Sequence, residues 1–143
     1  MGEKRILIND LDRIEQRVEF VKYPEDSHLC GFIYNKDNND YLCCSSINGY
    51  INIWDLYNKK IFKVIYTNCY LGYIIEWNSK YIIVVDYYNR SFKIVDKDKG
   101  KIISDIGGQH NQYMICVKKI YHPIYGESLL SASEDHTIKL WDI

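Results

Sequence analysis

A serine, a histidine and an aspartate near the C-terminus are the residue types of a hydrolytic triad. They are His110, Ser133 and Asp135, and Trp141 follows them. In a triad the aspartate orients the histidine, which takes the proton of an exposed serine beside an oxyanion hole. The sequence contains no G-x-S-x-G turn of the kind that exposes a nucleophilic serine. We therefore expect these residues to be structural, with Trp141 bonded to the serine. The alternative is a serine hydrolase, in which Ser133 would react with a fluorophosphonate probe.

Three cysteines and a histidine suggest a metal site, because thiolate and imidazole are the ligands that zinc prefers. They are His28, Cys30, Cys43 and Cys44. Adjacent residues of a strand point to opposite faces, so Cys43 and Cys44 cannot both join one site. The chain has five cysteines, and an odd number favours reduced thiols over a disulfide framework. We expect buried thiols that behave as small apolar side chains, with no metal and no cofactor.

The charge of the chain gives no reason to expect a nucleic-acid or membrane partner. Its 143 residues have the length of one ordinary domain, and a net charge of -1 does not attract phosphate backbones or anionic lipid. The first ten residues, MGEKRILIND, carry charges where a signal peptide has an apolar run, and no stretch has the length and hydropathy of a membrane span. We expect an intracellular, cytoplasmic protein whose partners are other proteins.

The elements that must position these side chains are short strands that recur along the chain. Similar segments end at Asp10, Asp55, Asp96 and Asp142, and a period of about 40 to 45 residues with four strands each is typical of propeller blades. Asn48-Gly49, between two β-rich runs, predicts a tight hairpin turn. The strands are expected at 17–23, 29–34, 41–46, 50–54, 60–66, 72–77, 81–86, 91–95, 101–106, 114–121, 128–132 and 137–141.

The C-terminal segment SEDHTIKLWD, residues 133–142, resembles the end of a WD40 repeat. The resemblance implies an all-β fold of WD40-type β-propeller blades, each with four antiparallel strands, in an incomplete ring of about three blades. It divides the chain into the final strand of a preceding blade, at about 5–11, and three repeats at about 12–55, 56–96 and 97–142.

The resemblance also implies a buried hydrogen-bonded set in each repeat, made of a loop histidine, a hairpin serine, a turn aspartate and the tryptophan. In the first repeat an asparagine stands where the aspartate is expected, and the second repeat has a valine in place of the tryptophan. The matching residues are His110, Ser133, Asp135 and Trp141 in the third repeat, and Ser46, Asn48 and Trp54 in the first.

Propellers of this family bind partners on the face formed by the loops before the first strand and by the turn between the middle strands. Exposed tyrosines on such a face make good interface anchors. The alternative is that these tyrosines only cover the edges of the blades. The candidate partner-binding residues are Ile47, Tyr70, Tyr73, Tyr88, Tyr113 and Glu134.

Together these observations predict a non-catalytic protein–protein interaction scaffold that is a fragment of, or a partner in, a larger propeller. Propellers typically need four to eight blades, so we expect self-association that completes the ring. The alternative is a regulatory or targeting propeller segment of a larger multidomain enzyme whose catalytic domain is not in this chain.

Overall fold

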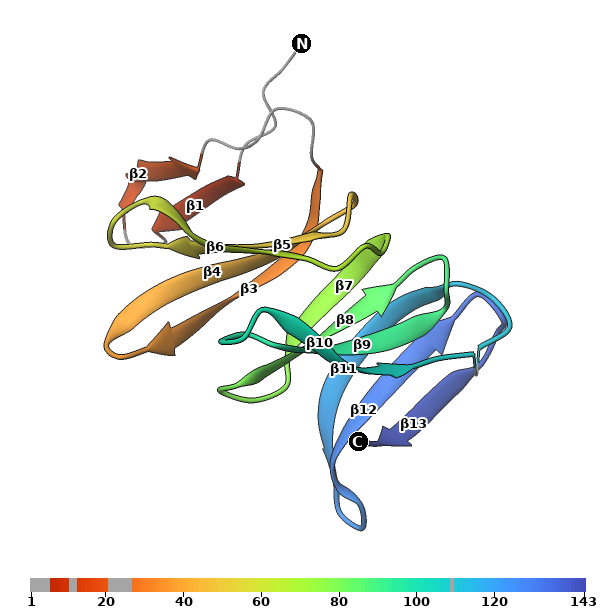
Figure 1. Cartoon of the computed structure of the whole chain (residues 1–143). Coiled ribbons are helices and arrows are strands. Elements are labelled where there is room, and N and C mark those ends of the chain that lie inside the picture. Colours follow the sequence, from red (N-terminus) through yellow and green to blue (C-terminus); the bar gives the residue numbers. More distant parts are fainter. Residues whose placement is uncertain (1–5, 11–12, 21–26, 109) are drawn as a thin grey trace.

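The chain folds into antiparallel β-sheets that follow one another in an arc (Figure 1). The computed structural model describes residues 6–10, 13–20, 27–108 and 110–143, and none of these residues is helical. The strands are β1 (Ile6–Asp10), β2 (Arg13–Phe20), β3 (His28–Lys36), β4 (Asn39–Ser46), β5 (Tyr50–Asp55), β6 (Lys60–Tyr66), β7 (Leu71–Glu76), β8 (Tyr81–Asp86), β9 (Ser91–Asp96), β10 (Lys101–Ile106), β11 (Met114–His122), β12 (Gly126–Ser133) and β13 (Ile138–Asp142).

The described residues form four sheets, and three of these follow the predicted arrangement of blades. Strands β3 to β6 form sheet 1, strands β7 to β10 form sheet 2, and strands β11 to β13 form sheet 3, each paired in chain order. A separate two-stranded sheet, β1–β2, lies at the other end of the arc from β13 (Figure 1). The predicted all-β class, the four-stranded antiparallel blades and the open ring are confirmed.

Most strand bounds agree closely with those expected from the sequence. Strands β6, β8 and β10 have the predicted bounds. Strand β2 begins four residues earlier than the predicted strand 17–23, of which residues 21–23 lie outside the described residues, as do residues 5 and 11 of the predicted leading strand. The Asn48-Gly49 turn is present, and Gly49 has the positive φ of 87° that such a turn requires.

Each sheet buries apolar side chains against the next one. Between sheets 1 and 2 the core contains residues such as Ile51 and Ile53 of β5 against Ile82 and Val84 of β8. Between sheets 2 and 3 it contains residues such as Ile83, Val85 and Phe92 against Val117 and Leu129. The molecule therefore has layers of side chains between successive sheets, as a stack of blades requires.

The recurring aspartates hold the turns that lead from the third strand of a sheet to the fourth. Asp55 Oδ1 accepts a hydrogen bond from the backbone N–H of Asn58 at 2.8 Å, and Asp96 Oδ1 accepts one from Lys99 at 2.9 Å. Bonds from the Asn58 backbone and side-chain amides hold the pKa of the Asp55 carboxyl below its usual range. Aspartate is favoured here because its side chain satisfies the backbone donors of the turn.

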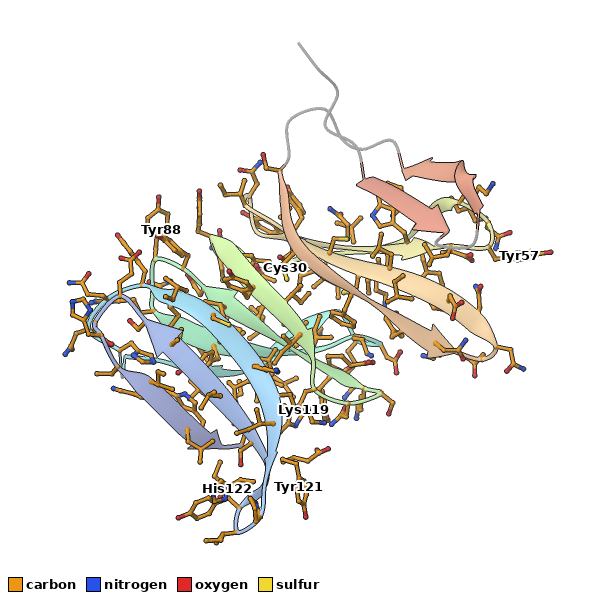
Figure 2. The ribbon with its side chains drawn as sticks, turned by 180° about the vertical axis from the view of Figure 1, so that it is seen from behind. Cys30, Tyr57, Tyr88, Lys119, Tyr121 and His122 are labelled. Atoms are coloured by element: carbon orange, nitrogen blue, oxygen red, sulfur yellow. The ribbon has the colours of Figure 1, made fainter. Side chains whose placement is uncertain are left out.

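Lysine side chains bind backbone carbonyls across both junctions between sheets. Lys63 Nζ of sheet 1 donates to the carbonyl oxygen of Lys97 in sheet 2 at 3.0 Å. Lys119 Nζ of sheet 3, labelled in Figure 2, donates to the carbonyl oxygen of Trp77 at 2.6 Å and lies 4.9 Å from the centroid of its ring system. These contacts help to fix the relative positions of the sheets.

Candidate functional site

The best-defined polar constellation is a chain of hydrogen bonds inside sheet 3, which we call the polar set. Trp141 Nε1 donates to Ser131 Oγ at 2.7 Å. Ser131 Oγ lies 2.8 Å from His110 Nε2, and His110 Nδ1 lies 2.9 Å from Asp135 Oδ2. An indole N–H can only donate and a carboxylate can only accept. Nδ1–H therefore donates to Asp135, and with a neutral imidazole the Ser131 hydroxyl donates to Nε2.

Asp135 is the end point of the set and accepts further hydrogen bonds. The Thr137 hydroxyl donates to Oδ1 at 2.6 Å, and the backbone N–H groups of Thr137 and Asn111 donate to the carboxylate at 2.9 Å each. The Thr137 hydroxyl, followed by the Asn111 amide and the His110 side chain, holds the pKa of Asp135 well below its usual range. The turn before β13 is thereby tied to the loop before β11.

The serine of this set is Ser131, which corrects the prediction of Ser133. The hydroxyl of Ser133 donates to the carbonyl oxygens of Gln112 and Tyr113 at 3.1 and 2.9 Å. Both serines point to the same face of β12, because side chains two residues apart share a face. Trp141 of β13 pairs with Leu129 of β12. The next side chain of β12 on the same face as Leu129 is that of Ser131, and the indole lies beside it.

A serine, a histidine and an aspartate at these distances reproduce the hydrogen-bond order of a catalytic triad. The nucleophile, however, is buried: Ser131 is 1% exposed, and its oxygen already accepts the indole N–H of Trp141. The Trp141 ring also packs edge-on against Phe92 of sheet 2, with centroids 5.1 Å apart. The arrangement satisfies buried polar groups and fastens two loops to a strand, but it leaves no room for a substrate at the serine oxygen.

The position of Ser131 is filled differently in the other two sheets. Leu42 pairs with Trp54 in sheet 1 and Ile82 pairs with Val95 in sheet 2, just as Leu129 pairs with Trp141 in sheet 3. Ser131 is the second residue after Leu129. The second residue after Leu42 is Cys44 in sheet 1, and the second residue after Ile82 is Val84 in sheet 2, so these two are the counterparts of Ser131.

In sheet 1, Trp54 and Leu42 form an apolar cluster with Cys44. The serine and asparagine predicted for this sheet lie elsewhere: Ser46 is buried at the end of β4, and Asn48 is exposed in the turn that follows. That Ser46, Asn48 and Trp54 act as one set stays a prediction.

The thiols of sheet 1 lie on opposite faces of β4, as expected for neighbours in a strand. Cys43 belongs to the core between sheets 1 and 2, whereas Cys44 belongs to the cluster around Trp54. Burial raises the pKa of Cys44 to about 12, so the thiol is neutral at physiological pH. In the described part of the chain, no group of three or more histidine, cysteine or acidic side chains is placed to hold a metal ion.

Four tyrosines from three loops form a contact cluster, which we call the tyrosine cluster. Tyr87 stacks on Tyr113 with ring centroids 4.3 Å apart and an interplanar angle of 13°. Tyr88 packs against Tyr70 at 4.6 Å and meets the edge of Tyr113 at 6.3 Å. The predicted partner-binding residues Tyr70, Tyr88 and Tyr113 are thus brought together, and the sequence reasoning missed Tyr87. The signal was available, since Tyr87 is adjacent to Tyr88 in the same turn.

The other predicted partner-binding residues are placed around this cluster. Glu134 lies beside it, because its backbone N–H donates to the carbonyl oxygen of Tyr113 at 3.0 Å. Burial and the negative charge of Glu134 raise the pKa of Tyr87. Ile47 lies in the turn between β4 and β5 of sheet 1, half-buried. Tyr73 lies on β7 with 42% of its side chain exposed.

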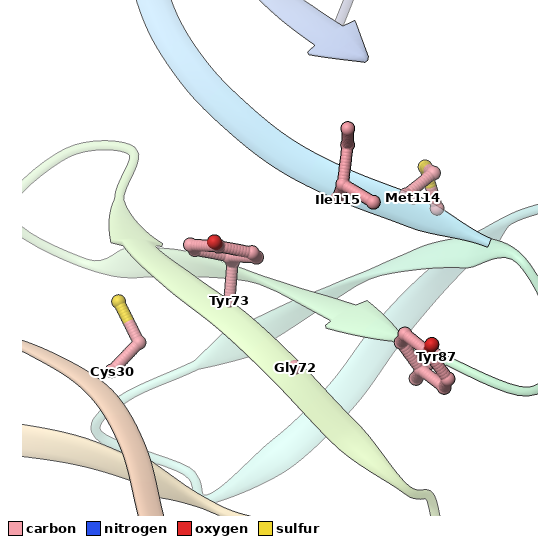
Figure 3. A pocket seen from close by; sticks show the side chains of 6 residues that line it. All are labelled: Cys30, Gly72, Tyr73, Tyr87, Met114 and Ile115. Carbon is pink, nitrogen blue, oxygen red and sulfur yellow. The ribbon is translucent and has the colours of Figure 1, made fainter. Parts of the chain in front are cut away.

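An apolar cavity lies beside the tyrosine cluster and shares Tyr87 with it. Figure 3 shows the cavity, which has a volume of about 340 Å³. The innermost strands of all three sheets line it, and none of its lining side chains is charged. The lining residues are Cys30, Gly72, Tyr73, Tyr87, Met114 and Ile115.

Sequence reasoning missed a second exposed aromatic group at the tip of the β11–β12 hairpin. Tyr121, Ile124 and Tyr125 are exposed there, and the rings of His122 and Tyr125 stack at 4.7 Å. Figure 2 shows that this tip is distant from Tyr88. The described residues include no helix of the length and hydropathy that a membrane crossing needs.

A segment near the C-terminus of this chain matches a known protein-family model. Residues 102–142 match the WD40 family, described as WD domain, G-beta repeat. The match spans β10 to β13 and therefore contains all four members of the polar set, His110, Ser131, Asp135 and Trp141. The match shows that residues 102–142 carry a WD40 repeat, and the successive antiparallel sheets are consistent with a partial β-propeller of this type.

Proposed function

We propose that this protein is a non-catalytic protein–protein interaction scaffold that binds its partner through the tyrosine cluster. A WD40 repeat by itself suggests an interaction scaffold. The observation that carries the finer proposal is the convergence of Tyr70, Tyr87, Tyr88 and Tyr113 from the loops of sheets 2 and 3 into one set of touching rings.

The chemistry of this surface suits a protein segment better than a small polar metabolite. Tyrosine offers a large apolar face with a hydroxyl at its rim, and residues of this kind are enriched among the energetically dominant positions of interfaces. Tyr88 is 60% exposed, so its ring is accessible to a partner. The cavity beyond Tyr87 accepts an apolar side chain, and Glu134 adds a carboxylate at the rim that favours a neighbouring cationic group.

The proposal that the protein is not a hydrolase rests on the burial and the hydrogen bonding of Ser131. An activated serine needs an accessible oxygen, and Ser131 Oγ is buried and accepts the Trp141 indole N–H. We therefore expect a fluorophosphonate probe to leave the folded protein unlabelled. Covalent labelling of Ser131 or Ser133 in folded protein would contradict the non-catalytic proposal.

The proposed interaction is tested by a photo-crosslinking amino acid placed at Tyr88. The matched control is Tyr57, a tyrosine that is also exposed but lies in the β5–β6 turn at a distant part of the molecule (Figure 2). Irradiation in cells that express the chain is expected to give discrete protein adducts from position 88, which are lost when Tyr113 is replaced by alanine. Equal adduct patterns from positions 57 and 88, or no adduct from position 88, would overturn the proposal.

A further inference from the structure

The ring of Tyr88 is the most exposed part of the tyrosine cluster, and it stands upright against the stacked pair of Tyr87 and Tyr113. The planes of the stacked pair differ by 13°, whereas the Tyr88 ring makes angles of 75° with Tyr87 and 76° with Tyr113. Tyr70 packs against the same ring at 4.6 Å. These neighbours hold Tyr88 in place, yet 60% of the residue stays exposed. The cluster therefore presents one well-supported aromatic ring to a partner.

The carboxylate of Glu134 lies beside the tyrosine cluster and is available for pairing. Glu134 begins the turn between β12 and β13, and its backbone N–H donates to the carbonyl oxygen of Tyr113 at 3.0 Å. Burial, and after it the charge of Glu134, raises the pKa of Tyr87, which indicates that the carboxylate acts on these rings. The Glu134 side chain is exposed, and none of the ion pairs among the described residues involves it.

The charged groups next to Glu134 do not neutralise it. The adjacent Asp135 is a second carboxylate, and its hydrogen bonds, that of the Thr137 hydroxyl first, keep its pKa low enough for it to be ionised at neutral pH. Arg90, in the same turn as Tyr88, donates through Nη1 to the carbonyl oxygen of Asn111 at 2.7 Å. Its guanidinium is therefore bound to the loop before β11. Two carboxylates and one guanidinium leave a net negative charge beside the rings.

An aromatic face and a carboxylate select the same kind of ligand group. The face of a phenol ring attracts a cation through its quadrupole, and a carboxylate attracts a cation through its charge. A guanidinium suits this pair better than an ammonium group, because its flat face stacks on a ring while its N–H groups, in the plane of the group, bind a carboxylate. An ammonium group is a compact and strongly hydrated charge that offers no flat face.

We propose that the partner of the tyrosine cluster presents an arginine side chain, whose guanidinium stacks on the exposed ring of Tyr88 and pairs with the carboxylate of Glu134. The proposal rests on the interaction surface proposed above and names the chemistry that this surface recognises. The rings and the carboxylate come from loops and turns of sheets 2 and 3, which lie next to each other in the molecule.

The first test titrates N-acetyl-arginine amide into the purified full chain, with the ring signals of Tyr88 followed by NMR. The matched probe is N-acetyl-citrulline amide, which has nearly the same shape but no charge. We expect a saturable shift with the arginine probe and about tenfold weaker binding of the citrulline probe, because the neutral group loses both the ring and the carboxylate attraction. N-acetyl-lysine amide is expected to bind about threefold more weakly than the arginine probe.

The second test removes each half of the site separately, with the ring signals of Tyr113 as the readout. Glu134→Gln and Tyr88→Leu are each expected to weaken binding of the arginine probe about threefold. The control for the carboxylate is Glu127→Gln, which removes an exposed carboxylate at the opposite end of β12. The control for the ring is Tyr57→Leu in the β5–β6 turn. Both controls are expected to bind as the original chain does, and circular dichroism establishes that every variant is folded.

Three results would overturn the proposal. They are the absence of a saturable shift with the arginine probe, equal binding of the citrulline probe, and a Glu134→Gln chain that binds as well as the original. The first two need no variant, so a variant that fails to fold does not leave the proposal untested. Adducts from position 88 together with no binding of the arginine probe would remove the arginine but keep the interaction surface. A lack of adducts from position 88 would instead remove the interaction surface itself.

Discussion

Sheet 3 and sheet 1 each pack a tryptophan of the third strand, but the residues around the two tryptophans differ in polarity. Each places a tryptophan on its third strand opposite a leucine, Trp141 with Leu129 and Trp54 with Leu42. In sheet 3 the next position holds Ser131, which links the tryptophan to a histidine and an aspartate. Sheet 1 holds a thiol there, and Trp54 packs in an apolar cluster.

Sheet 2 extends the comparison to a pair of apolar residues at the same two positions. Its counterparts of Ser131 and Trp141 are Val84 and Val95, both of them fully buried between sheets 1 and 2. The first three strands of each sheet nevertheless pair in the same antiparallel order. Sheet 2 therefore forms its strands with apolar residues at both positions, and the polar set of sheet 3 also fastens two loops to a strand.

The largest expected effect comes from removing the centre of the polar set. Replacing Ser131 by valine leaves His110 Nε2 and Trp141 Nε1 buried without their partner, and is expected to cost about 3 kcal/mol of the free energy of unfolding. The same replacement at Cys44 exchanges one small apolar side chain for another and is expected to cost about 1 kcal/mol or less. Urea unfolding of both variants gives the two values. Equal losses would show that the hydrogen bonds add nothing to sheet 3.

The reverse experiment introduces a hydroxyl into the apolar interior of sheet 2. Val84→Thr keeps the shape of the side chain but places a polar group in surroundings that include Ile82 and Val95. We expect a loss of about 2 kcal/mol, because a buried hydroxyl without a well-placed partner is costly. The control is Val64→Thr on β6, where 41% of the side chain is exposed and the change in thermal melting temperature is expected to be small. A neutral Val84→Thr would mean that sheet 2 accommodates polar groups as sheet 3 does.

Acid is expected to weaken sheet 3 through Asp135. The pKa of this carboxyl is lower in the folded chain than in the unfolded chain, where it is about 3.9. Its contribution is therefore complete above about pH 5, where both states are ionised, and is lost progressively as the pH falls through the unfolded-state pKa toward the folded-state pKa. Melting temperatures of the original chain and of Asp135→Asn, measured from pH 7 to pH 2, are expected to converge at low pH. A constant difference over this range would contradict the role assigned to the carboxylate.

The smallest effect is expected for an exposed ion pair between sheets. Lys36 Nζ lies 2.6 Å from Asp98 Oδ1, and both side chains are about half exposed. Lys36→Ala is expected to change the free energy of unfolding by about 0.5 kcal/mol or less, because water and salt screen such pairs. The change should decrease further in high salt. A loss as large as that of Ser131→Val would reverse the ranking of buried and exposed polar contacts.

The repeated pattern of the sequence predicted most strands well, because recognisable turn residues mark where the strands begin and end. The aspartates that end the third strands and the Asn48-Gly49 turn have local, short-range physical causes, and local causes are visible in the sequence. Strand β2 was placed four residues too late, since the residues before it offer no comparable turn signal.

The composition of the polar set was harder to predict for a physical reason. Ser131 and Ser133 share one face of β12, and only the pairing between strands decides which of them meets the indole. That pairing depends on residues distant in the sequence. Similarly, the sequence marked Tyr70, Tyr88 and Tyr113 as exposed anchors, but the stacking of Tyr87 on Tyr113 depends on how the loops of two sheets meet.

The stacked pair of Tyr87 and Tyr113 has a consequence for the thermodynamics of binding. One ring comes from sheet 2 and the other from the loop before sheet 3, and they are in contact at 4.3 Å before any partner arrives. Ordering a mobile side chain at an interface costs about 0.5 to 1.5 kcal/mol. Rings that already hold one another lose less freedom when a ligand covers them, so a larger share of their contact energy appears as affinity.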